Sequence, residues 1–320
     1  MTIPAPFTQF RYITPLLISV SIALTTALML LEVGNPIILW LNWATAGCLS
    51  LIIWNSISRF NLKGGSDLKA FAITWSTMTA GLQFCYCHFP ERDSFFKVAP
   101  QLIALMLALS SAMSLWQRRR STLKCLLLGL IIGLASTAIP HALLWIILFP
   151  VAGYYMRCWS SRNAFSMLTG VAFAVWVVYC ARFILQSPAV ADHMFRSYAV
   201  IMGDEDYSTL LQGLGLWQYL FMGISLLMLI IYNISGLLLG AGQSIRASSS
   251  IQLISMFSLV YTFLMAFDVC HFLSNFSVLW LFISLQLTIH QANVRSILHE
   301  WWIILIIIAI TALCIVPLFI

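Results

Sequence analysis

The chain has 320 residues, of which 61% are hydrophobic and only 8% are charged, and its mean hydropathy is +0.96. No water-soluble fold buries that much apolar surface, so the composition excludes a soluble globular protein and indicates a lipid bilayer as the solvent. The net charge of +6 comes from basic residues in short segments between apolar runs. This placement argues against a nucleic-acid-binding protein, which needs a continuous basic face.

The apolar runs are long and continuous rather than alternating, a pattern that predicts membrane-spanning helices and excludes a β-barrel. We predict an all-α, polytopic helical bundle without a soluble domain, with about eleven spans and a range of roughly ten to twelve. In chain order the predicted spans are 12–31, 36–58, 68–88, 98–116, 122–138, 140–156, 165–186, 214–239, 250–268, 272–290 and 301–319.

Two segments of this prediction depend on local breaks. The stretch 122–156 is too long for one ordinary span, and Pro140 favours two short helices that meet near His141, with one span as the open alternative. The serine-rich residues 244–250 predict a short inner loop.

The longest segment between predicted spans is 187–213, on the outer side. The apolar residues of Ala189–Met202 fall on one helical face, which predicts a short amphipathic helix that lies on the membrane surface. We otherwise expect residues 1–320 to form a single integral membrane domain.

The sixteen lysines and arginines divide unevenly between the two sides of the predicted bundle. With an inner N-terminus, twelve fall inside: Arg11, Arg59, Lys63, Lys69, Arg118, Arg119, Arg120, Lys124, Arg157, Arg162, Arg246 and Arg295. The other four fall outside: Arg92, Lys97, Arg182 and Arg196. Because short cytoplasmic loops are enriched in lysine and arginine, this asymmetry predicts an N-terminus inside and basic turns against anionic lipid headgroups of the inner leaflet. Membrane lipids are therefore the expected partners, and no protein partner is indicated.

Carboxylates and histidines near the predicted outer face are candidates for catalysis, because an ionisable group in lipid is costly. Glu32, in the first outer turn, is a candidate general base, and its alternative role is a turn residue beside Gly34 and Pro36. Asp268 and His271 are three residues apart, a spacing that brings both to one face of a helix end as a candidate catalytic pair. The alternative is a hydrogen-bonded pair at a polar turn.

Four further residues are candidates for substrate binding. Arg92 and Asp93 lie in a compact outer loop in which the arginine suits a phosphate, unless the loop is solvated and its charges pair internally. His141 follows the break at Pro140, and broken helices line binding sites in many membrane proteins; the alternative is an interfacial histidine. Arg182 lies about one turn inside the outer end of its span, where it meets either an anionic substrate or the headgroups.

No metal or cofactor is expected. The one cysteine cluster, Cys85-Tyr86-Cys87-His88, supplies three ligands at a spacing that does not match a zinc site, and packing at a helix end is the preferred interpretation. Gly-x-x-x-Gly spacing occurs at Gly129–Gly133 and Gly236–Gly240, and it allows two helices to approach closely.

Several features between Phe89 and Leu185 follow an order that resembles known families. They are Phe-Pro-Glu-Arg-Asp-Ser-Phe from Phe89, Pro100-Gln101-Leu102, the basic turn Gln117–Arg120, the glycine-rich run Leu128–Ala135, Pro140, and Cys158-Trp159-Ser160-Ser161-Arg162-Asn163. This order resembles an uncharacterised family of Bacteroidota inner-membrane proteins and, more distantly, the helical core of type C glycosyltransferases. The second resemblance implies a polyprenyl-phosphate-linked sugar as substrate and an acidic catalytic residue in a long first outer loop. Here that loop is short, and Glu32 is its only carboxylate.

Three functions remain open. The absence of a convergent polar motif favours a non-enzymatic component of envelope biogenesis, and the resemblance implies a bacterial inner membrane for it. The second, a transferase that uses a lipid-linked sugar, predicts that five candidates converge on one outer cavity: Glu32, Asp93, His141, Arg182 and Asp268. The third, a transporter of a small solute or lipid, requires polar groups at mid-depth. We single out only four large polar side chains within the spans: Asn55, Gln83, Asn233 and Gln286.

Overall fold

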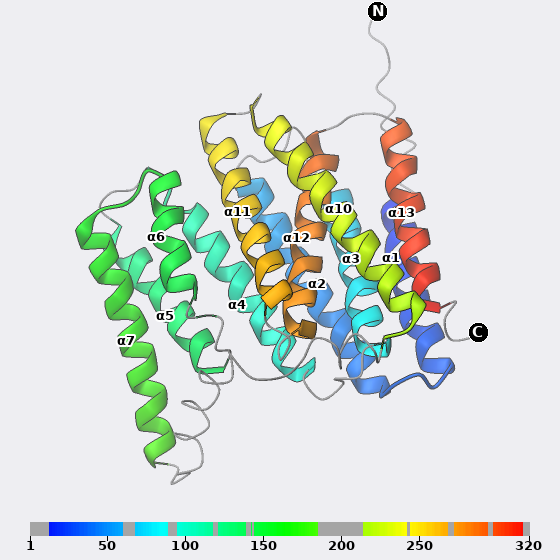
Figure 1. Ribbon diagram of the computed structural model, residues 1–320, viewed down its shortest axis with the longest axis horizontal. Coiled ribbons are helices and arrows are strands. Elements are labelled where there is room, and N and C mark those ends of the chain that lie inside the picture. Colours follow the sequence, from blue (N-terminus) through cyan, green and yellow to red (C-terminus); the bar gives the residue numbers. More distant parts are fainter. Residues whose placement is uncertain are drawn as a thin grey trace, which may run out of the picture. The chain divides into compact units, whose positions relative to one another are not determined.

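A computed structural model of the chain describes residues 13–59, 68–88, 95–117, 121–138, 142, 144–184, 214–241, 244–267, 272–293 and 297–315. Within these ranges the chain forms eleven helices and no strand (Figure 1). They are α1 (Ile13–Leu30), α2 (Pro36–Arg59), α3 (Leu68–His88), α4 (Phe95–Met113), α5 (Thr122–Ala138), α6 (Trp145–Tyr155), α7 (Ser161–Ile184), α10 (Leu216–Ala241), α11 (Ile245–Phe267), α12 (Phe272–Asn293) and α13 (Ile297–Ile315). The all-α prediction is confirmed for this part of the chain.

Five of the helices contain an apolar stretch long enough to cross a bilayer: Pro36–Ile57, Ser161–Ala181, Leu216–Leu238, Ile245–Met265 and Phe272–His290. Five shorter stretches are also apolar: Thr14–Leu30, Val98–Met113, Thr122–Thr137, Trp145–Tyr155 and Trp302–Ile315. Length and composition therefore make the chain a polytopic, helical integral membrane protein.

Two local predictions have opposite outcomes. The break expected at Pro140 is confirmed, because α5 ends at Ala138 and α6 begins at Trp145. The inner loop expected at 244–250 is wrong, because α11 already begins at Ile245. Ser244 accepts a hydrogen bond from the backbone N–H of Ala247, and the hydroxyls of later serines bond to carbonyls one turn back, so these serines cap and extend a helix.

The start of α2 shows how the sequence sets a helix boundary. Asn35 precedes the helix, and its side-chain oxygen accepts a hydrogen bond of 3.0 Å from the backbone N–H of Ile37. Pro36 takes the first helical position, where no intrahelical partner for its missing N–H is needed. The hydroxyl of Tyr86 in α3 accepts a further bond of 3.1 Å from the Asn35 backbone N–H, so α3 holds this turn in place.

The helices divide into two compact units. Unit 1 comprises residues 1–92, 215–236 and 280–320, and α3 lies at its centre, in contact with α1, α2 and α13 (Figure 1). From Ala70 to Cys87 every residue of α3 is buried except Phe71 and Trp75. Gly81 allows the ring of Trp280 to lie against the α3 backbone, since a Cβ there would be 2.6 Å from that ring.

Unit 2 comprises residues 93–214 and 237–279 and is built mainly from α4, α5, α6, α7 and α11. Its closest helix pair is α5 and α7, which lie side by side in Figure 1. The close approach predicted from Gly129 and Gly133 is confirmed, because Cβ atoms added there would lie 2.0 Å from the Met167 carbonyl oxygen and 2.7 Å from that of Val171. The prediction of one membrane domain over 1–320 stays a prediction, and the surface helix predicted within 187–213 lies outside the described residues.

Candidate functional site

Glu32 ends helix α1 in a Schellman motif. The backbone N–H of Glu32 bonds to the Met29 carbonyl, and that of Val33 bonds to the Leu28 carbonyl. Glu32 has φ 54° and an exposed side chain, so a glutamate occupies the left-handed position that usually belongs to glycine. The structure therefore gives Glu32 the turn geometry of its alternative interpretation, and its role as general base stays a prediction.

The other candidate side chains lie outside the described residues. This holds for Arg92, Asp93, His141, Asp268 and His271. Arg182 lies in the last turns of α7, but its side chain is not among those described. Whether these residues meet Glu32 in one cavity stays a prediction.

The cluster Cys85–His88 forms the end of α3 and packs against α13. The Nε2 atom of His88 lies 2.9 Å from the Cys314 carbonyl oxygen, and the Cys314 thiol donates to the Ala80 carbonyl at 3.3 Å. Across the described ranges, no three His, Cys, Asp or Glu side chains are arranged to hold a metal ion. The geometry matches packing at a helix end.

A row of hydrogen-bonded polar side chains joins α3 to α12 inside unit 1. The hydroxyls of Thr74 and Thr288 lie 2.7 Å apart, and one turn along α3 the Thr77 hydroxyl donates to Ser284 at 3.0 Å. All four side chains are buried. We use the name polar seam of unit 1 for all the polar side chains that bond across the helices of this unit. They are Thr25, Asn42, Thr74, Thr77, Gln83, Asn233, Ser235, Ser284, Gln286, Thr288 and His290.

The polar seam continues on the face of α12 that meets α10. The Gln286 amide donates to the Asn233 side-chain oxygen at 2.6 Å, and the Ser235 hydroxyl lies 2.9 Å from Nδ1 of His290. The ring of Tyr232 meets the His290 ring edge to face. Helix α12 thus bonds through side chains to two different neighbours within unit 1.

An amide cluster extends the seam to α1 and α2. The Gln83 amide nitrogen donates to the Leu39 carbonyl at 2.9 Å and to the Thr25 hydroxyl at 3.3 Å, while its oxygen accepts from Asn42 at 3.4 Å. Each of these three polar side chains is fully buried. Because a buried amide without partners is expensive in lipid, this cluster fixes α1, α2 and α3 against one another.

Unit 2 has its own buried polar cluster. The Trp145 indole N–H of α6 donates to the Tyr261 hydroxyl of α11 at 2.8 Å, and Tyr261 also bonds to Gln101 of α4. Ser274 of α12 donates to the Gln101 side-chain oxygen. Four helices therefore meet at one tyrosine hydroxyl and one amide.

The polar interior is larger than the sequence interpretation allowed. The four large polar residues singled out there omit Asn42, Gln101 and Asn275, which are fully buried, and include Asn55, which is exposed. The expectation of only four large polar side chains within the spans is therefore wrong. Alternation of apolar and polar residues was no guide, because α3 and α12 are buried on nearly all sides.

Every pair in these clusters joins hydroxyls, amides, an indole, an imidazole or backbone carbonyls. Such groups bind through hydrogen bonds and hold helices together, and the His290 imidazole, which pairs with the Ser235 hydroxyl, is the one group among them of a type that commonly acts as a general base. Comparisons of the chain with protein-family models, curated proteins and solved structures found no match. The arrangement of the buried polar groups therefore carries the functional argument.

Proposed function

We propose that this chain is a non-enzymatic component of envelope biogenesis in a bacterial inner membrane, with about eleven spans and a cytoplasmic N-terminus. The observation that carries the proposal is the polar seam of unit 1, whose side chains form hydrogen bonds between α1, α2, α3, α10 and α12. Polar side chains used in this way join helices in lipid, where apolar contacts provide little driving force between helices.

This use of polar groups supports a fixed framework over a catalytic centre. A catalytic site needs groups that are held in place and yet left available to a substrate. In the seam, Thr74, Thr77 and Gln83 each bond to a residue of another helix. A framework that presents loops to partners in the envelope needs helices that are fixed to one another in this way. It does not need interior side chains that are available to a substrate.

The test replaces one seam pair by apolar residues of the same shape, Thr74→Val with Thr288→Val. Because both partners are replaced, no buried hydroxyl is left without its cross-helix partner, and the change in stability is expected to be small. The double variant is expressed in a strain that lacks the protein, and its abundance in the membrane fraction is measured by immunoblotting. We expect it to restore detergent resistance in proportion to that abundance. Normal abundance without complementation would contradict a framework role.

A transporter is the second candidate, and one observation favours it. Three buried oxygen atoms of unit 1, Oδ1 of Asn42, Oγ1 of Thr79 and Oε1 of Gln286, have no hydrogen-bond partner among the described residues. Unsatisfied acceptors in a membrane interior are rare and mark polar pathways in many transporters. A transporter that uses the seam would lose uptake in the Thr74→Val, Thr288→Val variant at unchanged abundance.

The transferase alternative depends on the resemblance and on Glu32. Glu32→Gly separates its two roles, because glycine accepts the left-handed turn without strain while the carboxylate is lost. We expect this variant to be at least as stable as wild type and to leave cell-surface glycans unchanged. Altered glycans with normal expression would favour the transferase.

A further inference from the structure

Helix α13 is attached to unit 1 through other contacts than those of the polar seam. Among the described residues, the seam includes none from α13, whose main packing partner is α3. Cys314 of α13 makes two hydrogen bonds to α3. Its carbonyl oxygen lies 2.9 Å from Nε2 of His88, and its thiol donates to the Ala80 carbonyl at 3.3 Å. Cys314 thus links α13 to about two turns of α3.

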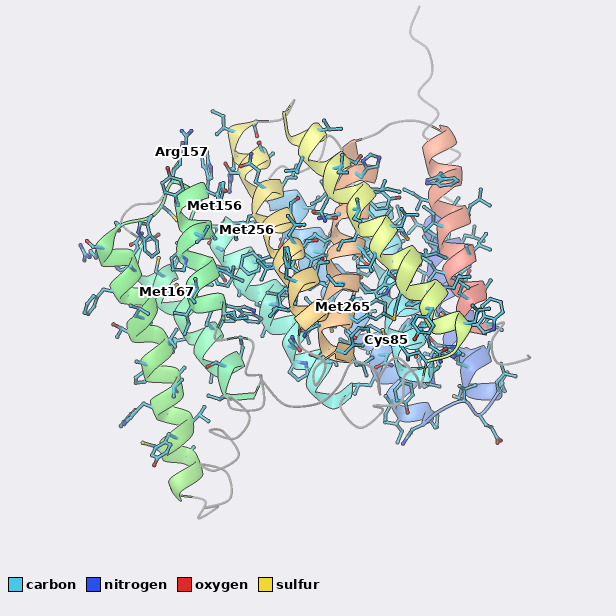
Figure 2. The ribbon with its side chains drawn as sticks, in the orientation of Figure 1. Cys85, Met156, Arg157, Met167, Met256 and Met265 are labelled. Atoms are coloured by element: carbon cyan, nitrogen blue, oxygen red, sulfur yellow. The ribbon has the colours of Figure 1, made fainter. Side chains whose placement is uncertain are left out.

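Two further thiols lie at the same end of α3. Cys85 and Cys87 belong to its last turn, and Figure 2 labels Cys85 there. Helices α3 and α13 both end at the lower side of unit 1 in Figure 1. All three cysteines carry thiols in this structure, and all three are buried. A group of buried thiols therefore lies where the two helices end.

Helix geometry selects Cys87 as the neighbour of Cys314. Cys87 follows Ala80 by about two turns, so it lies on the face of α3 that meets Cys314. It also directly precedes His88, which bonds to the Cys314 carbonyl. Cys85 follows Ala80 by about 1.4 turns and lies on a different face. The electrostatic interaction with the Cys314 thiol is accordingly larger for Cys87 than for Cys85.

The topology determines the redox environment of these thiols. Lys69, at the start of α3, and Arg295, just before α13, fall on the predicted inner side. Both helices therefore end on the outer side in the proposed topology. The compartment outside a bacterial inner membrane is kept oxidising by proteins that pass on their own disulfides. Two neighbouring thiols on this side meet the conditions for oxidation.

We propose that Cys87 and Cys314 form a disulfide that ties α13 to α3 at the outer end of unit 1. The thiolate of one cysteine attacks a disulfide of an oxidising protein, and the other cysteine then displaces that protein from the mixed disulfide. One S–S bond forms, and two electrons and two protons pass to the oxidant, which leaves as a dithiol. Because both thiols are buried in the folded protein, this exchange takes place before α13 packs against α3.

The test maps disulfides in the full-length protein from cell membranes. Membranes are precipitated with acid, and thiols are blocked with N-ethylmaleimide under denaturing conditions before digestion without reductant and mass spectrometry. We expect wild type to give two peptides linked through Cys87 and Cys314, which reductant separates. Cys87→Ser and Cys314→Ser should each lose this linked pair. Serine at position 314 keeps a donor for the Ala80 carbonyl, and immunoblotting of the membrane fraction shows that each variant is present.

Cys85→Ser is the matched control, because it removes a buried thiol from the same turn of α3 and should keep the linked pair. Blocked thiols at Cys87 and Cys314 in wild type would overturn the inference. A linkage of Cys314 to Cys85 in wild type would also overturn it, because the pair would then not follow the shared helix face.

The inference rests on the topology given under the proposed function, so that topology is measured separately. Alkaline phosphatase fused after Ile320 is active only when the end of the chain lies outside the cytoplasm. An active fusion without the linked pair would overturn the disulfide and leave the topology intact. An inactive fusion without the linked pair would overturn both. The linked pair with an active fusion supports both, and neither measurement depends on a role in envelope biogenesis.

Discussion

Helix α3 of unit 1 and the α5–α7 pair of unit 2 are held in opposite ways. Helix α3 is buried almost throughout, and its polar side chains bond to α1, α2 and α12. Helices α5 and α7 meet through glycines, and a Cβ at Gly170 would lie 2.3 Å from the Leu126 carbonyl oxygen. The rest of α7 is largely exposed, including Phe173 and Trp176.

The difference shows two solutions to one problem. In lipid, apolar side chains gain little by leaving the solvent, so helices associate through close backbone packing or through polar bonds. Close packing leaves no room for an added atom, whereas a polar pair depends on both partners being present. The two regions should therefore respond to different kinds of substitution.

The largest effect is expected at the glycine contact. Gly129→Ala with Gly170→Ala places a methyl group against backbone atoms on each helix, and backbone cannot move aside as a side chain can. We expect a loss of about 3 kcal/mol or more in stability, at the upper end for overpacked sites. Thermal unfolding in detergent, followed by a thiol-reactive dye, checks this because Cys125 and Cys158 are buried.

Gly223 provides the matched control, because nothing lies within 4 Å of a Cβ added there. Gly223→Ala lies within α10, where alanine is favoured over glycine by about 0.5–1 kcal/mol. The same substitution should therefore stabilise at this position. Equal unfolding temperatures for the Gly129, Gly170 variant and wild type would mean that α5 and α7 are not in contact through these glycines.

The second effect concerns the amide cluster of unit 1. Gln83→Met keeps a side chain of similar shape but removes the acceptor of the Asn42 amide and the donor to Thr25 and to the Leu39 carbonyl. We expect a loss of about 1–3 kcal/mol, the cost of leaving buried polar groups without partners. The measurement is again thermal unfolding.

A double variant sharpens this test. Gln83→Met with Asn42→Leu removes both polar partners, and it should be more stable than Gln83→Met alone because no buried Asn42 amide remains unsatisfied. If the two substitutions simply add, Asn42 and Gln83 are not coupled and the cluster does not fix α1, α2 and α3 through these amides.

Helix positions could be predicted from the sequence because their causes are local. Apolar runs mark each helix, and Pro140 lies at the break between α5 and α6. The serines at 244–250 led to the wrong prediction of a loop, because serine is common both in loops and at helix caps. Which of the two forms depends on the backbone groups that its hydroxyl can bond to.

The polar seam could not be predicted, for a different physical reason. Thr74 and Thr288 are 214 residues apart, and a helix buried on all sides gives no periodicity that says which face meets which neighbour. Unit 2 shows the same limit just after α4 and α6. The link between the turns at Gln117 and Met156 is a backbone bond and leaves no trace in the sequence.

The smallest effect is a pH dependence of stability that arises from Cys158, near the α5–α7 pair, and not from the threonines and amides of the polar seam. Burial, with a smaller contribution from the nearby Cys125 thiol, raises the pKa of Cys158, in the α6–α7 connection, from 9.0 to about 11. Below pH of about 9 this thiol is protonated in folded and unfolded protein alike, so it adds no pH dependence there. Between about pH 9 and about pH 11 the unfolded chain loses the proton while the folded chain keeps it, so stability should fall as pH rises.

Cys158→Ser keeps a donor for the Gly153 carbonyl and does not ionise in this range. We therefore expect thermal midpoints, followed by circular dichroism, to fall more steeply above about pH 9 in wild type than in Cys158→Ser. The amides and threonines of the seam do not titrate, so Thr74→Val with Thr288→Val should leave the wild-type slope unchanged. Parallel slopes for wild type and Cys158→Ser would show that this thiol is not buried as described.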